Sequence, residues 1–281
     1  MNPGPLSSEF PLTGHCIVVT RATTQAQSFC RLLEEQGADV FHFPVLEMVK
    51  VFSAEALKGF EAREDTYDGL LFTSANAVRF FMDFLQESGL DSEQEHAFWE
   101  RLEVSCVGKK TLKALEDFGK SADWIPQKSS AVGMAEELVA TERARGRHFL
   151  FPCSAIARPE LPGILQKAGA LVEQLSLYGP QPTDVDPEPL LRRLLAKGVD
   201  AITITSPSIG KAVVEKIGLT DLTEFQTVWA SIGPTTTQAL QELGCEPILE
   251  ASSPSVEKLV HTMIEFVIQE QQFRSLLDQE E

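Results

Sequence analysis

The sequence predicts an α/β protein built from two similar domains, each a parallel sheet flanked by helices. Short runs rich in valine, isoleucine, leucine and phenylalanine alternate with amphipathic helical stretches, which is typical of such sheets. One strand–turn–helix segment occurs twice in the sequence. The segments SCVGKKTLKALEDFG (105–119) and ASIGPTTTQALQELG (230–244) share two glycines, a threonine and an Ala-Leu pair at identical spacing. The length of 281 residues suits two domains better than one.

The first repeated unit, residues 15–44, reads as strand, polar turn, helix and strand. Its helix is expected to end at Gly37, because glycine readily adopts the left-handed conformation that closes a helix. The counterpart is 147–180, whose helix is expected to end at Gly169, 132 positions later. The first unit is therefore present in both halves.

The second unit, residues 67–85, corresponds to 199–217 at the same offset of 132. The third unit is the pair of segments 105–119 and 230–244. A Ser-rich turn leading into a helix then follows in both halves, at 126–139 and 250–263. Agreement across every unit indicates a duplicated α/β domain.

Two equivalent strand-like segments, at 41–49 and 173–182, end near prolines and are expected to pair as a two-stranded linker. The first repeated unit, 15–44, would then pack with the C-terminal half of the chain, so that one domain is formed by two separate stretches of sequence. The expected ranges are 1–44 with 180–267 for the first domain, 45–179 for the second, 41–49 and 173–182 for the linker strands, and 268–281 for a polar tail without an assigned function.

Composition narrows the class of protein. No apolar run approaches the roughly 20 residues that a membrane helix needs, so we expect a soluble, unexported protein with no membrane partner. Five cysteines are an odd count without CxxC spacing, which is typical of buried thiols in a reducing compartment and predicts a cytoplasmic location. The net charge of −17 argues against nucleic acid, and the isolated histidines predict no metal site.

Turns of small hydroxyl residues follow the predicted strands. A parallel sheet gathers these turns at its carboxyl edge, where ligands bind in open α/β folds. Helix starts there offer unpaired N–H groups and a partial positive charge, so they can hold a carboxylate without a basic side chain. The same serines and threonines are equally explained as helix N-caps, each worth about 1 kcal/mol. The turns lack GxGxxG and GxxxxGK[ST], which makes a nucleotide-using enzyme a poor alternative.

Seven short motifs, in one order along the chain, together resemble the uroporphyrinogen-III synthase family over about residues 14–266. They are VTR (19–21), DGLLFTSANAV (68–78), VGKKT (107–111), LFPC (150–153) with Arg158 downstream, LYG ending the strand at Tyr178, TSPS (205–208) and IGPTT (232–236).

The resemblance implies a HemD-like fold, with two flavodoxin-like α/β domains joined by a two-stranded ladder and an active cleft between them. It implies a lyase that cyclises hydroxymethylbilane to uroporphyrinogen III, with loss of water and inversion of the terminal pyrrole ring. It also implies a monomer that needs no cofactor or metal, and we expect transient contact with the preceding pathway enzyme. The alternative is a non-catalytic HemD-like domain that binds an anionic small molecule or a tetrapyrrole.

The resemblance also assigns site residues. Tyr178 is the expected catalytic acid, because a phenol with a pKa near 10 stays protonated at working pH, although it could simply close a linker strand. Arg21 and Arg158 are the expected partners of substrate carboxylates, and each could instead form a surface ion pair. The other expected substrate-binding residues are Thr20, Thr73, Ser74, Ala75, Gly108, Thr111, Cys153, Ser154, Ser206, Pro207, Ser208, Gly233, Pro234, Thr235 and Thr236.

One motif departs from the family pattern. Ala75 and Asn76 stand where some members have Pro-Arg, so a basic contact is missing there, and Lys109 and Lys110 are candidates to replace it.

Overall fold

The computed structural model describes residues 10–218, 227–246 and 248–277. The chain divides into two compact units. Unit 1 is formed by residues up to Glu47 together with those from Pro180 onward, and unit 2 by Met48–Gly179.

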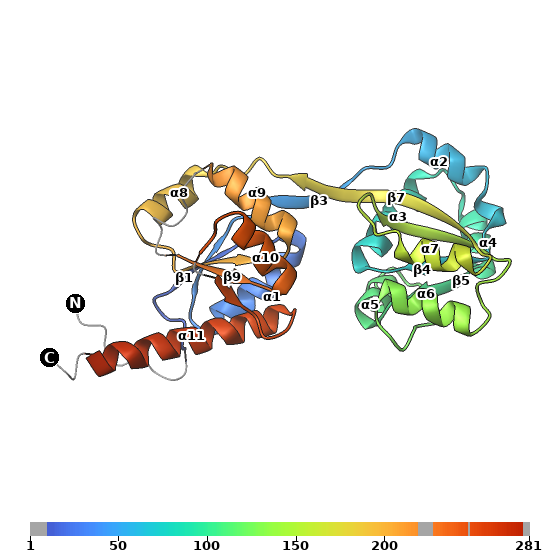
Figure 1. Cartoon of the computed structure of the whole chain (residues 1–281). Helices are drawn as coiled ribbons and strands as arrows, with labels where there is room; N and C mark the ends of the chain where they lie inside the picture. The colour runs from blue at the N-terminus through green and yellow to red at the C-terminus, as the bar shows by residue number, and fades with distance from the viewer. Residues whose placement is uncertain (1–9, 219–226, 247, 278–281) are drawn as a thin grey trace. The chain divides into compact units, whose positions relative to one another are not determined.

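Unit 1 contains a sheet of five parallel strands in the order β10-β9-β8-β1-β2. Strand β1 lies between β8 and β2, so residues far apart in the sequence are neighbours in the sheet (Figure 1). The strands are β1 (Cys16–Val19), β2 (Asp39–His42), β8 (Ala201–Ile204), β9 (Val228–Ser231) and β10 (Ile248–Glu250).

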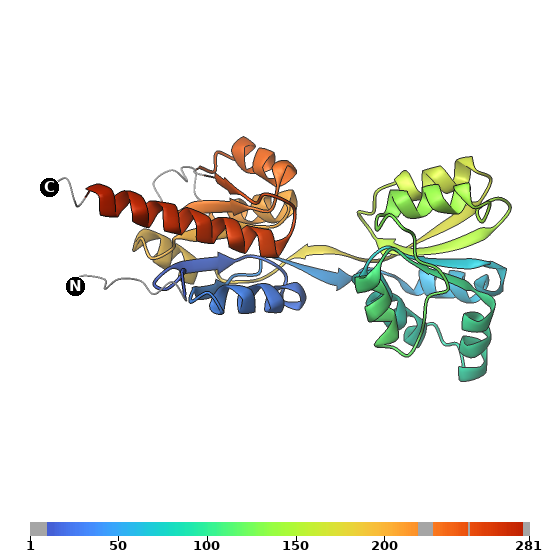
Figure 2. The same cartoon turned by 90° about the horizontal axis from the view of Figure 1, so that it is seen from below.

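Helices cover both faces of this sheet. The helices of unit 1 are α1 (Thr23–Glu34), α8 (Glu188–Leu195), α9 (Pro207–Ile217), α10 (Pro234–Glu242) and α11 (Val256–Leu277). Val18 packs with residues of α8, α9 and α10, whereas Ile17 and Val19 pack with α1 and α11. Figure 2 shows α1 and α11 side by side on their shared face. The strands are therefore apolar on both sides, as parallel strands between two helical layers must be.

Unit 2 contains a five-stranded sheet in the order β3-β7-β6-β4-β5. Its strands are β3 (Leu46–Lys50), β4 (Gly69–Phe72), β5 (Glu103–Cys106), β6 (His148–Ser154) and β7 (Leu171–Pro182). Strands β4 to β7 are parallel to one another. The segment containing β3 runs antiparallel to β7, because the Val51 N–H donates to the Leu177 carbonyl while the Thr183 N–H donates to the Val45 carbonyl.

The helices of unit 2 also form two layers. They are α2 (Ala54–Glu61), a 3-10 turn (Glu64–Thr66), α3 (Ala75–Glu87), α4 (Ser92–Arg101), α5 (Lys109–Glu116), α6 (Ala131–Ala140) and α7 (Glu160–Lys167). Leu70 and Phe72 face the layer of α2 to α5, and Leu71 faces α6 and α7. The fold class expected from the sequence is confirmed, because the structure contains two mostly parallel sheets flanked by helices.

The two sheets share one strand order. Strands β1, β8 and β9 of unit 1 take the places that β6, β4 and β5 take in unit 2. An isolated parallel bridge between Ser105 and Trp124 stands where unit 1 has β10. Each unit thus combines segments from both sequence repeats. In unit 1, β1 and β2 come from the first repeat and β8 to β10 from the second; in unit 2, β4 and β5 come from the first repeat and β6 and β7 from the second.

One detail of the expected linker differs in the structure. The single strand expected at 41–49 is two strands, β2 and β3, because the chain leaves the sheet of unit 1 at Phe43–Val45, around Pro44, before it pairs with β7. The polar tail from 268, expected either to extend the last helix or to fray, extends it, because α11 continues to Leu277; residues 278–281 lie outside the described residues. In the part of the chain that is described, no helix is long and apolar enough to cross a membrane.

A repeated aspartate joins the starts of the central strands in both units. The Asp68 carboxylate accepts the His148 N–H at 2.8 Å, and the Asp200 carboxylate accepts the Cys16 N–H at 2.7 Å. The aspartate N–H groups in turn donate to the His148 and Cys16 carbonyls. The aspartates that recur 132 residues apart therefore do the same structural work, which is to satisfy backbone groups at the sheet edge.

The two units place side chains of different size at one equivalent pair of positions in their central strands. In unit 2, Gly69 lies opposite Phe149, and in unit 1, Ala201 lies opposite Ile17. A Cβ atom on Gly69 would come within 2.8 Å of the Phe149 ring, so glycine and phenylalanine fit only as a pair.

We expect Gly69→Ala to lower the free energy of unfolding by about 1–3 kcal/mol, because the added methyl group overpacks a buried ring. Combining it with Phe149→Ile, which reproduces the residue pair of unit 1, should recover part of the loss. Urea denaturation of the single and double variants measures this coupling. Strictly additive losses would contradict the pairing.

Candidate active site

Unit 2 has a cavity of about 370 Å³ at the carboxyl edge of its sheet. Strands β4 and β6 end there, Tyr178 of β7 lies beside them, and the segments that follow β4 and β6 lead into α3 and α7. The lining residues are Thr73, Ser74, Ser130, Ala131, Val132, Phe151, Cys153, Ser154, Ala157, Arg158, Glu160, Leu161 and Tyr178. The cavity thus collects hydroxyl groups and apolar side chains from the ends of β4 and β6, from β7 and from the start of α6.

Tyr178 is the most constrained polar side chain of this cavity. It is 6% exposed, and its hydroxyl lies 2.9 Å from Ser74 Oγ. The Phe80 ring stacks on the Tyr178 ring, with 4.8 Å between the centroids and 11° between the planes. Burial raises the pKa of Tyr178 above its ordinary value, and the hydrogen bond with Ser74 partly offsets this. The phenol is therefore protonated throughout the neutral range.

Helices α3, α6 and α7 begin at the cavity, and α3 and α6 are capped by serine. Ser74 Oγ accepts the Ala77 N–H at the start of α3, and Ser130 Oγ accepts the Gly133 N–H at the start of α6, each at 3.0 Å. The other N–H groups of each first turn have no partner within the helix, so both helix starts favour negative charge nearby.

The charged groups at this cavity are of both signs. Arg158 is exposed, and Glu160 at the first turn of α7 lines the same cavity. Burial raises the pKa of the Cys153 thiol to about 11. Cys153 is therefore a neutral thiol and not a nucleophilic thiolate.

The carboxyl edge of unit 1 carries the other set of expected residues. Ser206 Oγ accepts the Ile209 N–H at the start of α9 and lies 3.1 Å from Ser208 Oγ. The exposed residues at these turns are Pro207, Ser208, Pro234 and Thr235. This edge offers solvent-facing hydroxyls next to two helix starts.

Arg21 follows β1 at this edge and is only half-buried. Burial lowers its pKa, and the nearby Glu257 carboxylate opposes that shift. The Arg21 carbonyl accepts a hydrogen bond from His42 Nε2 at 2.9 Å, which ties the end of β1 to the end of β2.

Several expected site residues are buried in their own turns. Thr20 is fully buried, and its hydroxyl donates to the Thr203 carbonyl at 2.6 Å. Thr111 and Thr236 occupy equivalent positions in the first turns of α5 and α10, and each is 3% exposed. The recurring threonine therefore fills the same internal space in both repeats.

The repeated glycines before α5 and α10 are buried as well. A Cβ atom would lie 3.1 Å from Ser129 Oγ at Gly108, and 3.4 Å from a Pro254 ring atom at Gly233. Both glycines have extended backbones, so close packing by the following Ser-rich turn accounts for them better than strain does.

Of the expected residues in unit 2, one group shares the cavity. It comprises Thr73, Ser74, Cys153, Ser154, Arg158 and Tyr178. Ala75 begins α3, and the lining does not include it, Gly108 or Thr111. Ser130, Glu160 and Phe80 were not expected as site residues from the sequence. Ser130 could have been found, because it lies in the recurring Ser-rich turn, whereas Phe80 reads only as one apolar helix position.

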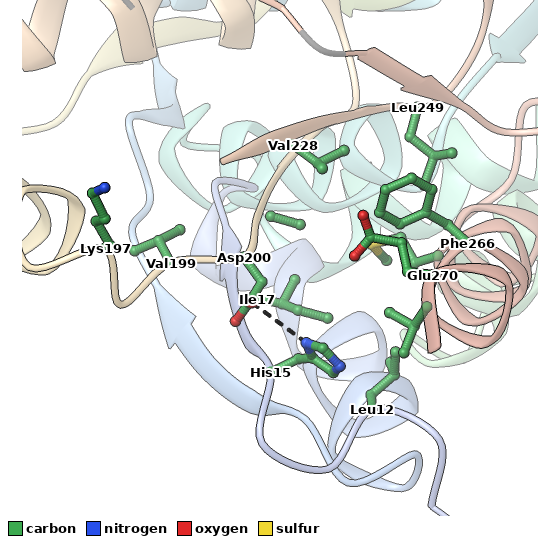
Figure 3. A pocket seen from close by; sticks show the side chains of 13 residues that line it. Leu12, His15, Ile17, Lys197, Val199, Asp200, Val228, Leu249, Phe266 and Glu270 are labelled. Carbon is green, nitrogen blue, oxygen red and sulfur yellow. Dashed lines mark ion pairs between the residues drawn. The ribbon is translucent and has the colours of Figure 1, made fainter. Parts of the chain in front are cut away.

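A second cavity, of about 430 Å³, lies at the amino edge of the unit 1 sheet (Figure 3). An ion pair between His15 and Asp200, 3.4 Å apart, faces the side where α11 contributes Phe266 and Glu270. None of the expected site residues lines this cavity. Ligands of open α/β folds bind at the carboxyl edge of the sheet, and this cavity lies at the opposite edge, so we do not place the active site there.

Comparisons with known proteins identify the family. The family model for uroporphyrinogen-III synthase HemD matches residues 27–261. A uroporphyrinogen-III synthase from Chlorobaculum parvum is 30% identical over 230 residues, which cover 81% of this chain and 89% of that protein. One from Synechococcus elongatus is 28% identical over 259 residues, which cover 90% of this chain and 96% of that protein.

A solved structure agrees in fold. The crystal structure of uroporphyrinogen-III synthetase from Helicobacter pylori matches with a TM-score of 0.61 at 20% sequence identity, over 90% of this chain and 99% of that one. The resemblance found in the sequence motifs is thus confirmed by the family model, and the architecture by the structure. The chain belongs to the uroporphyrinogen-III synthase HemD family.

Proposed function

We propose that this protein is a lyase that cyclises hydroxymethylbilane to uroporphyrinogen III, with loss of water and inversion of the terminal pyrrole ring. Membership of the family supports the reaction. One observation supports placing this reaction at the cavity of unit 2. The protonated, nearly buried phenol of Tyr178 is hydrogen-bonded to Ser74 at this hydroxyl-lined cavity.

The cavity of unit 2 suits part of a polycarboxylate. The acetate and propionate groups of the substrate would contact Thr73, Ser154 and the N-terminus of α6. Hydroxyl and amide groups there can donate hydrogen bonds to a carboxylate without a cluster of basic side chains. Arg158 would add one charge-assisted contact. Glu160 in the same lining disfavours a second carboxylate beside it and so limits where the acidic groups lie.

Tyr178 would act as the general acid. Its proton passes to the departing hydroxyl as the C–O bond breaks, and water leaves behind an azafulvene that the far pyrrole ring attacks to form a spiro intermediate. The spiro species fragments and recloses with that ring reversed. The ring carbon that forms the last bond then releases a proton, and the phenolate regains one. Because the open chain closes spontaneously to the wrong isomer, the protein's main task is to fix geometry.

The exposed turns of unit 1 are proposed as further substrate contacts. Arg21 is the cationic member, and the others are Ser206, Pro207, Ser208, Pro234 and Thr235. For the buried residues Thr20, Thr111, Thr236, Gly108 and Gly233 we propose an indirect role, which is to shape the turns that present the exposed groups.

We further propose that the protein acts as a cytoplasmic monomer without a cofactor and makes transient contact with the enzyme that supplies its unstable substrate. All five cysteines are unpaired thiols, which supports a reducing compartment.

The direct test supplies freshly generated hydroxymethylbilane and separates the uroporphyrin isomers. We expect mostly isomer III, formed at a rate proportional to protein concentration. Isomer I alone, at the rate of the protein-free control, would favour the non-catalytic binding domain over the enzyme.

Tyr178→Phe should lower the rate of isomer III formation by about 10²-fold, because the acid is lost while the ring still packs. Tyr67→Phe is the matched control, since Tyr67 is the other tyrosine of the chain, is 1% exposed and precedes β4 at the opposite sheet edge. Initial rates and melting temperatures of both variants are compared with wild type. Equal rates for both variants would remove the acid role from Tyr178.

Arg158→Gln should raise KM about tenfold with a smaller effect on kcat, because one charge-assisted contact to a carboxylate is worth roughly 1.5–3 kcal/mol at most. Arg145→Gln is the control. It removes an exposed arginine that precedes the start of β6, at the end of the strand away from Arg158, and it should leave KM unchanged. Steady-state kinetics of the two variants make the comparison. A similar KM change in both would indicate a general charge effect instead of a contact.

A further inference from the structure

Tyr178 is held from two sides by α3 and its N-cap residue. Its hydroxyl lies 2.9 Å from Oγ of the N-cap Ser74, and its ring lies flat against Phe80, almost two turns later in the helix. One short helical segment therefore fixes both the plane of the ring and the position of the oxygen.

The duplication shows which of these features the fold itself requires. At the offset of 132, Ser74 corresponds to Ser206, and Ser206 caps α9 as Ser74 caps α3. Phe80 corresponds to Ala212 on α9 and Tyr178 to Leu46, the first residue of β3, so the equivalent positions carry no aromatic pair. The serine cap is thus common to both units, whereas the stacked pair is an addition in unit 2.

The surroundings of Ser74 favour one direction for its hydroxyl proton. A serine hydroxyl has one proton to donate and two lone pairs. One lone pair accepts the Ala77 N–H at 3.0 Å, and the partial positive charge at the start of the 13-residue helix α3 lies beside the oxygen. That field favours directing the hydroxyl proton away from the helix, toward the phenol oxygen 2.9 Å away.

We propose that Ser74 and Phe80 are positioning residues for Tyr178: Ser74 donates its proton to the phenol oxygen, Phe80 fixes the ring plane, and the Tyr178 O–H is thereby directed into the cavity. The inference deepens the proposed function, because it explains how the acid is aimed. Ser74 would also stabilise the phenolate that forms when Tyr178 gives up its proton, since a hydrogen bond to an anion is about twice as strong as one to a neutral group.

The chain offers a clean measurement of the Ser74 contact. It contains two tyrosines, and Tyr67 has a pKa raised to about 12 by burial. In a Tyr67→Phe background, the ultraviolet absorbance of the tyrosinate reports Tyr178 alone. We expect Ser74→Ala in that background to make Tyr178 about tenfold weaker as an acid, because the donor to its oxygen is lost.

Three variants control this titration. Ser74→Thr keeps the hydroxyl and should restore the parent curve. Ser74→Gly removes the hydroxyl at a capping cost of only a few tenths of a kcal/mol, so it tests the same point if Ser74→Ala folds poorly. Ser206→Ala removes the equivalent cap of α9 and should leave the titration unchanged. An unchanged or stronger acid in Ser74→Ala or Ser74→Gly would overturn the donor role.

Phe80 is tested by rate in the wild-type background. Phe80→Leu should lower kcat for isomer III about tenfold with KM nearly unchanged, and Phe80→Tyr, which can still stack, should retain most of the rate. Equal rates for Phe80→Leu and wild type, or a loss that follows only the melting temperature, would overturn its role. The tyrosinate titration needs no substrate, so it decides the Ser74 inference even if the protein proves not to form isomer III.

Discussion

The central constraint on this protein is that parallel strands must be covered on both faces while all their carboxyl ends meet at one edge. In each unit, Val18 or Leu70 packs on one helical layer and the adjacent residue of the same strand packs on the other. Many of the helices that provide this cover follow directly after a strand, as α1 follows β1, α3 follows β4 and α9 follows β8. Their starts and the strand-terminal side chains therefore gather at the same edge without any further requirement on the sequence.

The duplication separates what the fold needs from what the chemistry needs. Features present in both units, such as the strand-linking aspartates, the buried turn threonines and the serine caps, satisfy backbone groups or fill space. Tyr178, Phe80 and Cys153 have no like residue at the equivalent position of unit 1. Function is then most economically sought in the differences between the copies, a criterion that an unduplicated chain does not offer.

The sequence predicted the fold class and most helix ends because these follow from local rules. Gly37, Gly119, Gly169 and Gly244 all adopt the left-handed conformation that ends a helix. Ser74 and Tyr178 were predicted as site residues from motifs, but their contact joins positions 104 apart and depends on how β7 lies beside β6 and α3. Likewise, Thr111 and Thr236 were expected to bind substrate, and only the folded structure shows that both are buried.

The exchange of segments between the repeats has a consequence for synthesis on the ribosome. Unit 2 is one continuous stretch, Met48–Gly179, so every strand of its core emerges before any later part of the chain is needed. Strand β1 is made first, yet its neighbour β8 emerges only after all of unit 2 has been translated. The nascent chain must therefore keep β1 and β2 from pairing with other strands while the intervening unit completes itself.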